Sequence, residues 1–285
     1  MKANPISPTI PLDQDGVHHG FLKLPYSRDD SAWGSVMIPL TVIKHGEGPT
    51  ALLTGANHGD EYEGPIALQE LAATTKAEDV TGRLIIVPAF NYPAYRAGTR
   101  TSPIDKGNMN RSFPGRPDGT VTEKIADYFQ RTLLPMADLA VDFHSGGKTL
   151  DFVPFAAAHI LDDKATQEAC FAAMRAFNAP YSVELLEIDS AGMYDTAVEE
   201  MGKVLGLLKS INEFFLIAIS IPVLLDFCLS HLQKMIQAGF EELVVIQEFE
   251  ALLTSPKSLL YYTWLLSLFL GKRLIAYFLR KRLGL

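Results

Sequence analysis

Residues 55–64 read Gly-Ala-Asn-His-Gly-Asp-Glu-Tyr-Glu-Gly, a polar turn bracketed by glycines. The apolar run 51–54 before it is typical of a strand, and the stretch 65–71 after it is typical of a helix with proline in its first turn. In open α/β sheets, ligands bind at such turns, at the carboxyl ends of strands. His58 and Glu61 lie in this turn, where an imidazole and a carboxylate can bind one metal ion, and such mixed ligation suits zinc. The pair alone is a weak pattern, so a metal site here depends on residues elsewhere in the chain.

The composition of the 285-residue chain limits its class. Hydrophobic residues make up 48% of it, enough for one large domain or two small ones. The formal net charge of -8 and the pI of about 5.4 argue against a general nucleic-acid binder, which needs a basic face. Cys170 and Cys228 are too few for a disulfide scaffold, and the N-terminus shows no apolar signal-peptide core. We therefore expect a cytoplasmic protein.

Alternating strand and helix patterns predict an α/β domain over residues 1–204. A helix lies between the strand-like runs 51–54 and 82–88, and this order predicts a parallel crossover. Residues 89–120 form a long polar stretch, which is unusual unless it carries function. Further strand-like runs cover residues 20–24, 35–43, 137–144 and 152–161, and helical patterns cover 121–134 and 163–177. The fold class expected is a mainly parallel or mixed sheet flanked by helices.

Residues 205–285 differ from the rest of the chain in composition and in hydrophobic pattern. They contain little glycine, carry long apolar runs at 214–225 and 259–270, and end in a basic cluster. We predict a helical C-terminal segment here. Neither run reaches the roughly 18 to 20 apolar residues that a bilayer-spanning helix needs. Two alternatives remain open, a helical hairpin packed on itself or on the first domain, and a membrane-associated segment with a basic flank.

A second histidine strengthens the metal prediction. His144 ends a predicted strand, and Asp142, two residues earlier, faces the same side of that strand. A His, Glu, His set of His58, Glu61 and His144 would leave one position open for water, as in catalytic zinc sites. Asp142 would then hydrogen-bond the second nitrogen of a zinc-bound histidine. The remaining histidines, including His159, have no partner spacing, and we expect them on the surface or in the core.

The long polar stretch carries candidate substrate-binding residues. Arg111, held by neighbouring turns beside Asn110, can clamp a carboxylate through two parallel hydrogen bonds. Arg100 can do the same or polarise a carbonyl group that is under attack. Each arginine taken singly is also compatible with a solvated surface position.

Three motifs together resemble the succinylglutamate desuccinylase/aspartoacylase family, which has a zinc carboxypeptidase-like fold. They are His-Gly-Asp-Glu-Tyr-Glu-Gly at 58–64, Asn-Met-Asn-Arg-Ser-Phe-Pro-Gly at 108–115 and Asp-Phe-His-Ser-Gly-Gly at 142–147. They occur in the same order as in the family, and the resemblance covers about residues 10–204.

The resemblance implies a function and a role for each motif. His58, Glu61 and His144 correspond to the zinc ligands, Asn110 and Arg111 to the binders of the substrate carboxylate, and Arg100 to the arginine that polarises the carbonyl. The implied reaction is hydrolysis of an N-acyl amide on a small amino acid, and we expect the acyl group to be acetyl. Zinc would activate water and the carbonyl group, and a glutamate would transfer the proton.

That glutamate is not evident in the sequence. The family places it soon after the part equivalent to 201–204, in a glycine-containing segment that this chain lacks. Glu213 is the nearest candidate, although it precedes an apolar run. The final strands of the family are also not recognisable. Three hypotheses follow: a zinc-dependent deacetylase, a zinc-binding pseudoenzyme without the general base, and a membrane-associated protein anchored by residues 205–285.

Overall fold

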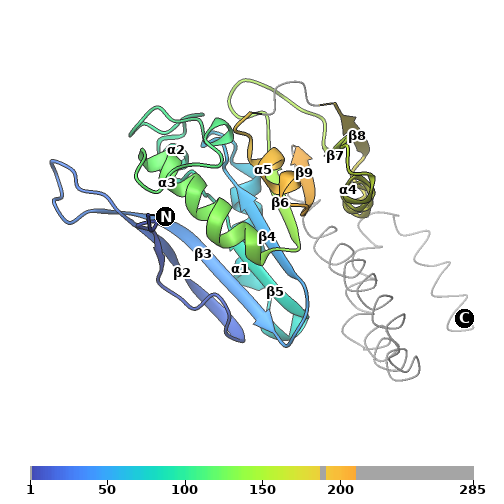
Figure 1. The fold of residues 1–285 in the computed structure, drawn as a ribbon, viewed down its shortest axis with the longest axis horizontal. Helices are drawn as coiled ribbons and strands as arrows, with labels where there is room; N and C mark the ends of the chain where they lie inside the picture. The colour runs from blue at the N-terminus through green and yellow to red at the C-terminus, as the bar shows by residue number, and fades with distance from the viewer. Residues whose placement is uncertain (1, 187–190, 210–285) are drawn as a thin grey trace, which may run out of the picture. The chain divides into compact units, whose positions relative to one another are not determined.

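The computed structural model describes residues 2–186 and 191–209, which form a nine-stranded mixed sheet with helices on both sides (Figure 1). The strand order is β1-β2-β3-β5-β4-β6-β9-β7-β8. The strands are β1 (Ser7–Pro8), β2 (Gly16–Pro25), β3 (Ser35–His45), β4 (Thr50–Gly55), β5 (Gly82–Val87), β6 (Leu139–His144), β7 (Phe155–His159), β8 (Tyr181–Leu185) and β9 (Val204–Lys209). The sheet is parallel from β5 through β4 and β6 to β9, and antiparallel at β1 to β3, between β3 and β5, and between β9 and β7. This confirms the predicted fold class.

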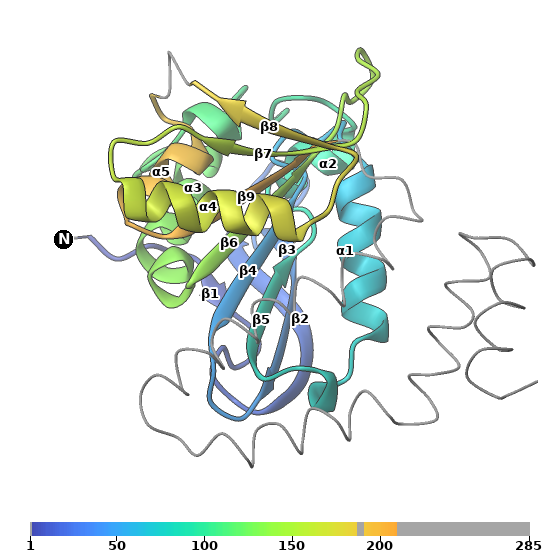
Figure 2. The same ribbon diagram turned by 90° about the vertical axis from the view of Figure 1, so that its right-hand side faces the viewer.

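The helices connect these strands and cover the sheet. They are α1 (Glu63–Thr74), α2 (Tyr92–Ala97), α3 (Val121–Tyr128), α4 (Lys164–Ala176) and α5 (Tyr194–Glu200), with short 3-10 turns η1 (Ala77–Asp79), η2 (Met109–Arg111) and η4 (Leu134–Met136) and a π turn η3 (Phe129–Leu133). Helix α1 lies on one side of the sheet and α3 on the other (Figure 2). Helix α3 begins at a capping box in which Thr120 and Glu123 satisfy each other's backbone N–H groups, which is why the helical pattern starts there.

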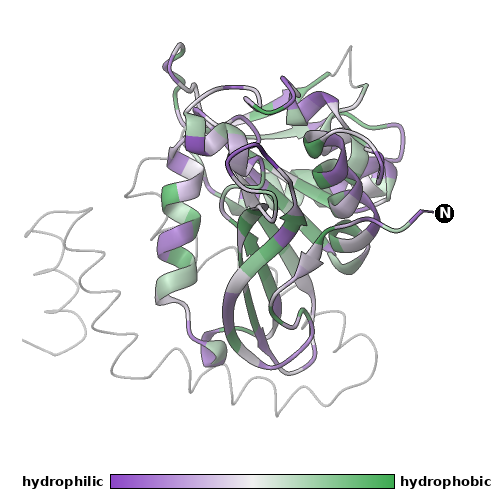
Figure 3. Cartoon of the chain, turned by 90° about the vertical axis from the view of Figure 1, so that its left-hand side faces the viewer, coloured by the Kyte–Doolittle hydropathy of each residue, from purple (hydrophilic) through white to green (hydrophobic). Residues whose placement is uncertain are grey.

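The core follows from the apolar strand sequences. Strands β4, β5 and β6 are buried along almost their whole length, as expected for parallel strands covered on both faces. Hydrophobic residues gather in these central strands, whereas the helices around them carry both hydrophobic and polar residues (Figure 3). The unit β4–α1–β5 is parallel, with Ala51 beside Leu84, which confirms the predicted crossover.

Two glycines in the stretch 55–64 after β4 permit close packing at the edge of the sheet. A Cβ on Gly59 would come within 2.0 Å of the carbonyl carbon of Ala94, and a Cβ on Gly64 would come within 2.6 Å of the Cβ of Phe143. Contacts this short do not occur for real Cβ atoms, so only glycine fits at these two positions. The turn can therefore lie directly against α2 and the end of β6.

The predicted start of the helical segment at residue 205 is wrong for residues 205–209, which belong to β9. Leu205, Leu207 and Leu208 are buried in a strand between β6 and β7. A short continuous apolar run fits a buried strand and a buried helix equally well, so the pattern alone could not decide. The apolar runs 214–225 and 259–270 and the basic end lie outside the described residues. Among the residues that are described, no helix combines the length and the hydrophobicity needed to cross a bilayer.

Candidate metal centre

The predicted metal ligands meet at the ends of two neighbouring parallel strands. His58 and Glu61 lie in the turn after β4, and His144 is the last residue of β6. Gly55 in β4 pairs with Phe143 in β6, so both strand ends reach the same edge of the sheet. All three residues are buried, with exposed fractions of 4%, 4% and 2%. The fold thus brings together residues that are more than 80 positions apart in the sequence.

The carboxylate of Glu61 lies between the two imidazoles. Its Oε1 is 2.8 Å from His58 Nδ1, and its Oε2 is 2.8 Å from His144 Nδ1. The backbone N–H of Ser145 also donates to Oε2, at 3.1 Å. One ligand atom from each of the three residues lies within 4.8 Å of the others, an arrangement that can hold a metal ion.

The charges of this cluster favour metal binding at neutral pH. Burial alone would raise the pKa of Glu61, but its short contacts with the imidazoles of His144 and His58 outweigh burial and hold that pKa well below its usual range. Burial lowers the pKa of His58, against the opposing effect of its hydrogen bond to Glu61. Glu61 is therefore ionised and His58 neutral near pH 7, the protonation states that a metal ion requires.

The donor set itself fits a metal ion. When His144 donates its Nε2 proton to Asp142, its Nδ1 presents a lone pair to Glu61 Oε2 at 2.8 Å. Two acceptors at that distance need a proton or a cation between them. A cation held by Nδ1 of His58, Nδ1 of His144 and the Glu61 carboxylate meets this need, and two imidazoles with one carboxylate match a zinc donor set.

Asp142 holds His144 from behind the cluster. Its Oδ2 lies 2.8 Å from His144 Nε2 and accepts a hydrogen bond from Asn57 Nδ2 at 3.0 Å, and its Oδ1 accepts one from Thr54 Oγ1 at 2.8 Å. Burial would raise the pKa of Asp142, but the charge of His144 and these hydrogen bonds lower it. The sequence led us to expect a hydrogen bond from Asp142 to the second nitrogen of a zinc-bound histidine, and the role of Asp142 in metal binding stays a prediction. Thr54 and Asn57 had no sequence signal of their own.

Arg100 lies at the open side of the cluster. Its Nη1 is 3.8 Å from Glu61 Oε1, and its side chain is 60% exposed. The loop that carries it contacts the segment after β6, because Lys148 Nζ donates to the carbonyl oxygen of Gly98 at 2.5 Å. The backbone N–H of Lys148 donates to Asp60 Oδ2 at 3.4 Å, in the turn that carries His58 and Glu61. The exposed guanidinium is thus within reach both of the cluster and of solvent.

Asn110 and Arg111 lie in η2, within the loop predicted to carry function. Asn110 is buried, and its Oδ1 accepts a hydrogen bond from the backbone N–H of Tyr194 at 2.9 Å. Arg111 is exposed and donates from Nη1 to the carbonyl oxygen of Asn110 at 2.6 Å. The part of Asn110 and Arg111 in substrate binding stays a prediction. Tyr194, which sequence reasoning did not single out, supports this turn.

The proton-transferring carboxylate is not supplied by the strand beside His144. Strand β9 reads Val-Leu-Gly-Leu-Leu-Lys, and its last residue, Lys209, pairs in register with His144. The candidate Glu213 lies outside the described residues.

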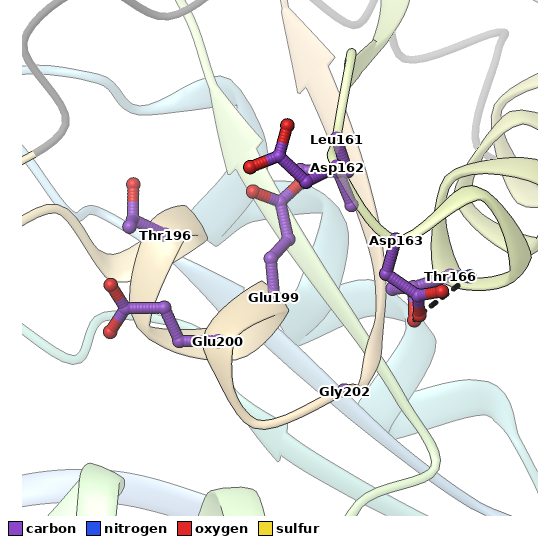
Figure 4. A pocket seen from close by; sticks show the side chains of 8 residues that line it. All are labelled: Leu161, Asp162, Asp163, Thr166, Thr196, Glu199, Glu200 and Gly202. Atoms are coloured by element: carbon purple, nitrogen blue, oxygen red, sulfur yellow. Dashed lines mark hydrogen bonds between the residues drawn. The ribbon is translucent and has the colours of Figure 1, made fainter.

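A second group of buried titratable residues lies away from the metal ligands. His159, at the end of β7, is buried with its Nδ1 2.9 Å from Glu199 Oε2 and its Nε2 3.9 Å from Asp195 Oδ2. Burial raises the pKa of Asp195. Glu199 also lines a pocket of about 380 Å³ together with Leu161, Asp162, Asp163, Thr166, Thr196, Glu200 and Gly202 (Figure 4). The predicted site residues do not line this pocket, so it is separate from the metal centre.

Comparison with known proteins agrees with this geometry. The family model for the succinylglutamate desuccinylase/aspartoacylase catalytic domain matches residues 47–206. The N-alpha-acetyl-L-2,4-diaminobutyric acid deacetylase of Halomonas elongata is 62% identical over 204 residues, which cover 72% of this chain and 60% of that protein. The chain thus spans about three fifths of the length of this curated relative.

Solved structures extend the comparison to the fold. The product-bound structure of the ectoine utilization protein EutE (DoeB) from Ruegeria pomeroyi has a TM-score of 0.76 at 81% identity, covering 79% of this chain and 71% of that one. A metallo-carboxypeptidase from Burkholderia cenocepacia has a TM-score of 0.54 at 17% identity, covering 70% and 62%, and shares the fold alone. Because this family model matches more than half of its residues, the chain belongs to the succinylglutamate desuccinylase/aspartoacylase family.

Proposed function

We propose that this chain hydrolyses the N-acetyl amide of a small amino acid, with Zn²⁺ held by His58, Glu61 and His144. The observation that carries the proposal is the buried cluster of these three residues, with Arg100 Nη1 3.8 Å from Glu61 at its open side. N-acetylated diaminobutyrate is the substrate we favour, because the relative from Halomonas elongata is a deacetylase of that compound.

Each residue has a distinct task in this reaction. A bound zinc ion would lower the pKa of a water molecule and polarise the amide carbonyl. Asp142 keeps the His144 ring oriented, with Nδ1 toward the cluster. Arg100 stabilises the negative charge that develops on the carbonyl oxygen, and Arg111 with Asn110 binds the substrate carboxylate. Glu213 is our candidate for the base that moves the proton to the leaving amine.

The proposal is tested by metal content and acetate release. Purified wild type should hold one zinc ion per chain by elemental analysis and release acetate from N-acetyl-diaminobutyrate. His58→Ala should lose both properties. His45→Ala, at the exposed end of β3, is the matched control and should keep both. Absence of zinc from the wild type, or equal activity in the two variants, would rule the proposal out.

A second candidate function is a metal-binding protein without efficient turnover. The observation that favours it is β9, which contains no carboxylate and places Lys209 in register beside His144. A general base contributes roughly 100- to 10,000-fold to the rate, so its loss would leave metal binding intact and hydrolysis slow.

Two substitutions separate these functions. If Glu213 is the base, Glu213→Gln reduces acetate release by about 100-fold or more at unchanged zinc content. If the chain lacks a base, Glu213→Gln has no effect, and Lys209→Glu increases acetate release by supplying a carboxylate at the strand position beside His144. A loss of activity in Glu213→Gln eliminates the second candidate.

A further inference from the structure

Tyr194 connects the turn of Asn110 and Arg111 with the residues behind His144. It is the first residue of α5 and is fully buried. Its ring packs between Phe113, at a centroid distance of 5.1 Å, and Phe90, at 5.4 Å. One side chain thus contacts two segments that are distant in sequence, the turn that ends at Phe113 and the segment of Phe90.

The backbone N–H of Tyr194 determines how the Asn110 amide is oriented. It donates to the side chain of Asn110 at 2.9 Å, and the accepting atom must be Oδ1, because an amide NH₂ cannot accept a hydrogen bond. The NH₂ group of Asn110 then points away from α5. No hydrogen bond of that NH₂ is found within the described part of the chain. A carboxylate ligand needs donors, so this orientation presents the group that a substrate carboxylate requires.

The segment before Tyr194 holds the rest of the turn. The carbonyl oxygen of Gly192 accepts a hydrogen bond from the Phe113 N–H at 3.1 Å. Gly192 has a φ of 75°, and a Cβ there would come within 2.7 Å of the Arg111 carbonyl oxygen, so a side chain would displace the turn. Residues 192–194 therefore fix both ends of the turn that carries Arg111.

The hydroxyl group of Tyr194 lies near Thr54 and Asp142, the residues behind His144. Its oxygen is buried and makes no well-formed hydrogen bond to a described residue. Burial raises the pKa of Tyr194 well above its usual value, and the nearby charge of Asp142 adds to this effect. Asp142 is the carboxylate that holds His144. Tyr194 therefore lies close both to the turn of Asn110 and Arg111 and to Asp142.

We propose that Tyr194 is a positioning residue that orients the Asn110 amide and the Arg111 turn for binding of the substrate carboxylate. The proposal rests on the proposed function for the identity of the ligand. Its structural part, the dependence of the turn on Tyr194, stands without turnover and can be measured separately.

Hydrogen exchange followed by mass spectrometry tests the structural part. Tyr194→Leu keeps an apolar side chain but removes the ring. We expect amides of residues 108–113 to exchange at least about tenfold faster, because the local opening becomes easier. Phe129→Leu is the matched control, since Phe129 is fully buried in the same aromatic cluster, 6.3 Å from the Tyr194 ring. Equal acceleration in both variants, or none in Tyr194→Leu, overturns the proposal.

The orientation of Asn110 has its own test. The Tyr194 amide should stay protected in Asn110→Asp, whose carboxylate keeps an acceptor, and lose protection in Asn110→Ala. Protection that persists in Asn110→Ala contradicts the assigned hydrogen bond. If the wild type turns over N-acetyl-diaminobutyrate, Tyr194→Leu should raise KM with kcat nearly unchanged, and Phe129→Leu should leave KM as it is. If the wild type shows no turnover, the proposed function fails while the exchange experiments still decide the role of Tyr194.

Discussion

Replacing Asp142 by asparagine should weaken metal binding while preserving the fold. Asparagine is the same size as aspartate, and its oxygen can take the Oδ2 position that faces His144 Nε2 and Asn57 Nδ2. Its NH₂ group then faces Thr54 Oγ1, which can rotate its own hydrogen toward the Val141 carbonyl oxygen 3.2 Å away. All hydrogen bonds are kept in some form, and the change that remains is loss of one negative charge behind His144.

The size of the effect follows from what that charge does. Carboxylates that hold the second nitrogen of a metal-bound histidine contribute about 10- to 100-fold to metal affinity. We therefore expect the zinc dissociation constant of Asp142→Asn to rise by that factor, or about 1.4 to 2.8 kcal/mol. Asp142→Ala should also lower the folding stability, because it leaves the buried donors of His144 and Asn57 without an acceptor. Each unpaired donor should cost about 1 to 3 kcal/mol of folding free energy.

The assay is competition for zinc with a chromophoric chelator, with thermal unfolding of the metal-free proteins measured in parallel. Asp127→Asn is the matched control, because Asp127 is also buried and hydrogen-bonded, to Asn4 and Arg131. It should leave zinc affinity unchanged. A zinc affinity of Asp142→Asn within threefold of wild type would show that Asp142 does not act through His144.

Three further predictions concern pH, packing and the long loop. The pKa of His58 is lowered in the folded state, so as the pH falls below its usual value of about 6.5 the unfolded chain takes up a proton before the folded one does. The melting temperature of the metal-free protein, measured by calorimetry, should therefore fall as the pH drops below that value. This fall should be less steep in His58→Gln. Gly64→Ala places a Cβ 2.6 Å from the Cβ of Phe143 and should destabilise the protein by about 1 to 3 kcal/mol in urea unfolding, whereas an unchanged midpoint would contradict the close packing. Asp105 accepts hydrogen bonds from the Thr122 N–H and hydroxyl at 2.7 and 2.8 Å. Asp105→Ala should therefore lower the free energy of unfolding by about 1 to 3 kcal/mol. Because these bonds lower the Asp105 pKa against the opposing effect of burial, that stability is present above its usual pKa and is lost as pH falls through the folded value, so the difference between variant and wild type should shrink in acid.

The sequence was sufficient to predict that His58, Glu61 and His144 lie together, because simple rules of strand order and strand ends apply to them. The turn at 55–64 follows a strand, His144 ends another, and parallel strands bring their carboxyl ends to one edge of the sheet. Side-chain alternation likewise put Asp142 on the same face as His144.

The same rules could not predict the support around the cluster. Tyr194 reaches Asn110 through a backbone hydrogen bond across 84 positions, and no periodicity records such a contact. The strand nature of residues 204–209 depends on their place between β6 and β7, which is a tertiary effect on a run that is ambiguous by itself. The sequence did not predict the short elements α2 and η2 in the polar loop, because one or two helical turns are too short to show a helical pattern.

The central place of β9 has a consequence for how the protein folds during synthesis. Strand β6 ends at residue 144, but its neighbour β9 begins only at residue 204. At a translation rate of about 5 to 20 residues per second, the edge of β6 waits roughly 3 to 12 s for its partner. During that interval an apolar strand edge is open to other nascent chains, which is the circumstance in which strands aggregate. The pair β7 and β8 is complete earlier, yet in the finished sheet it joins the body through β9. A chain released before residue 209 should therefore be held by chaperones, whereas one released after it can close the sheet.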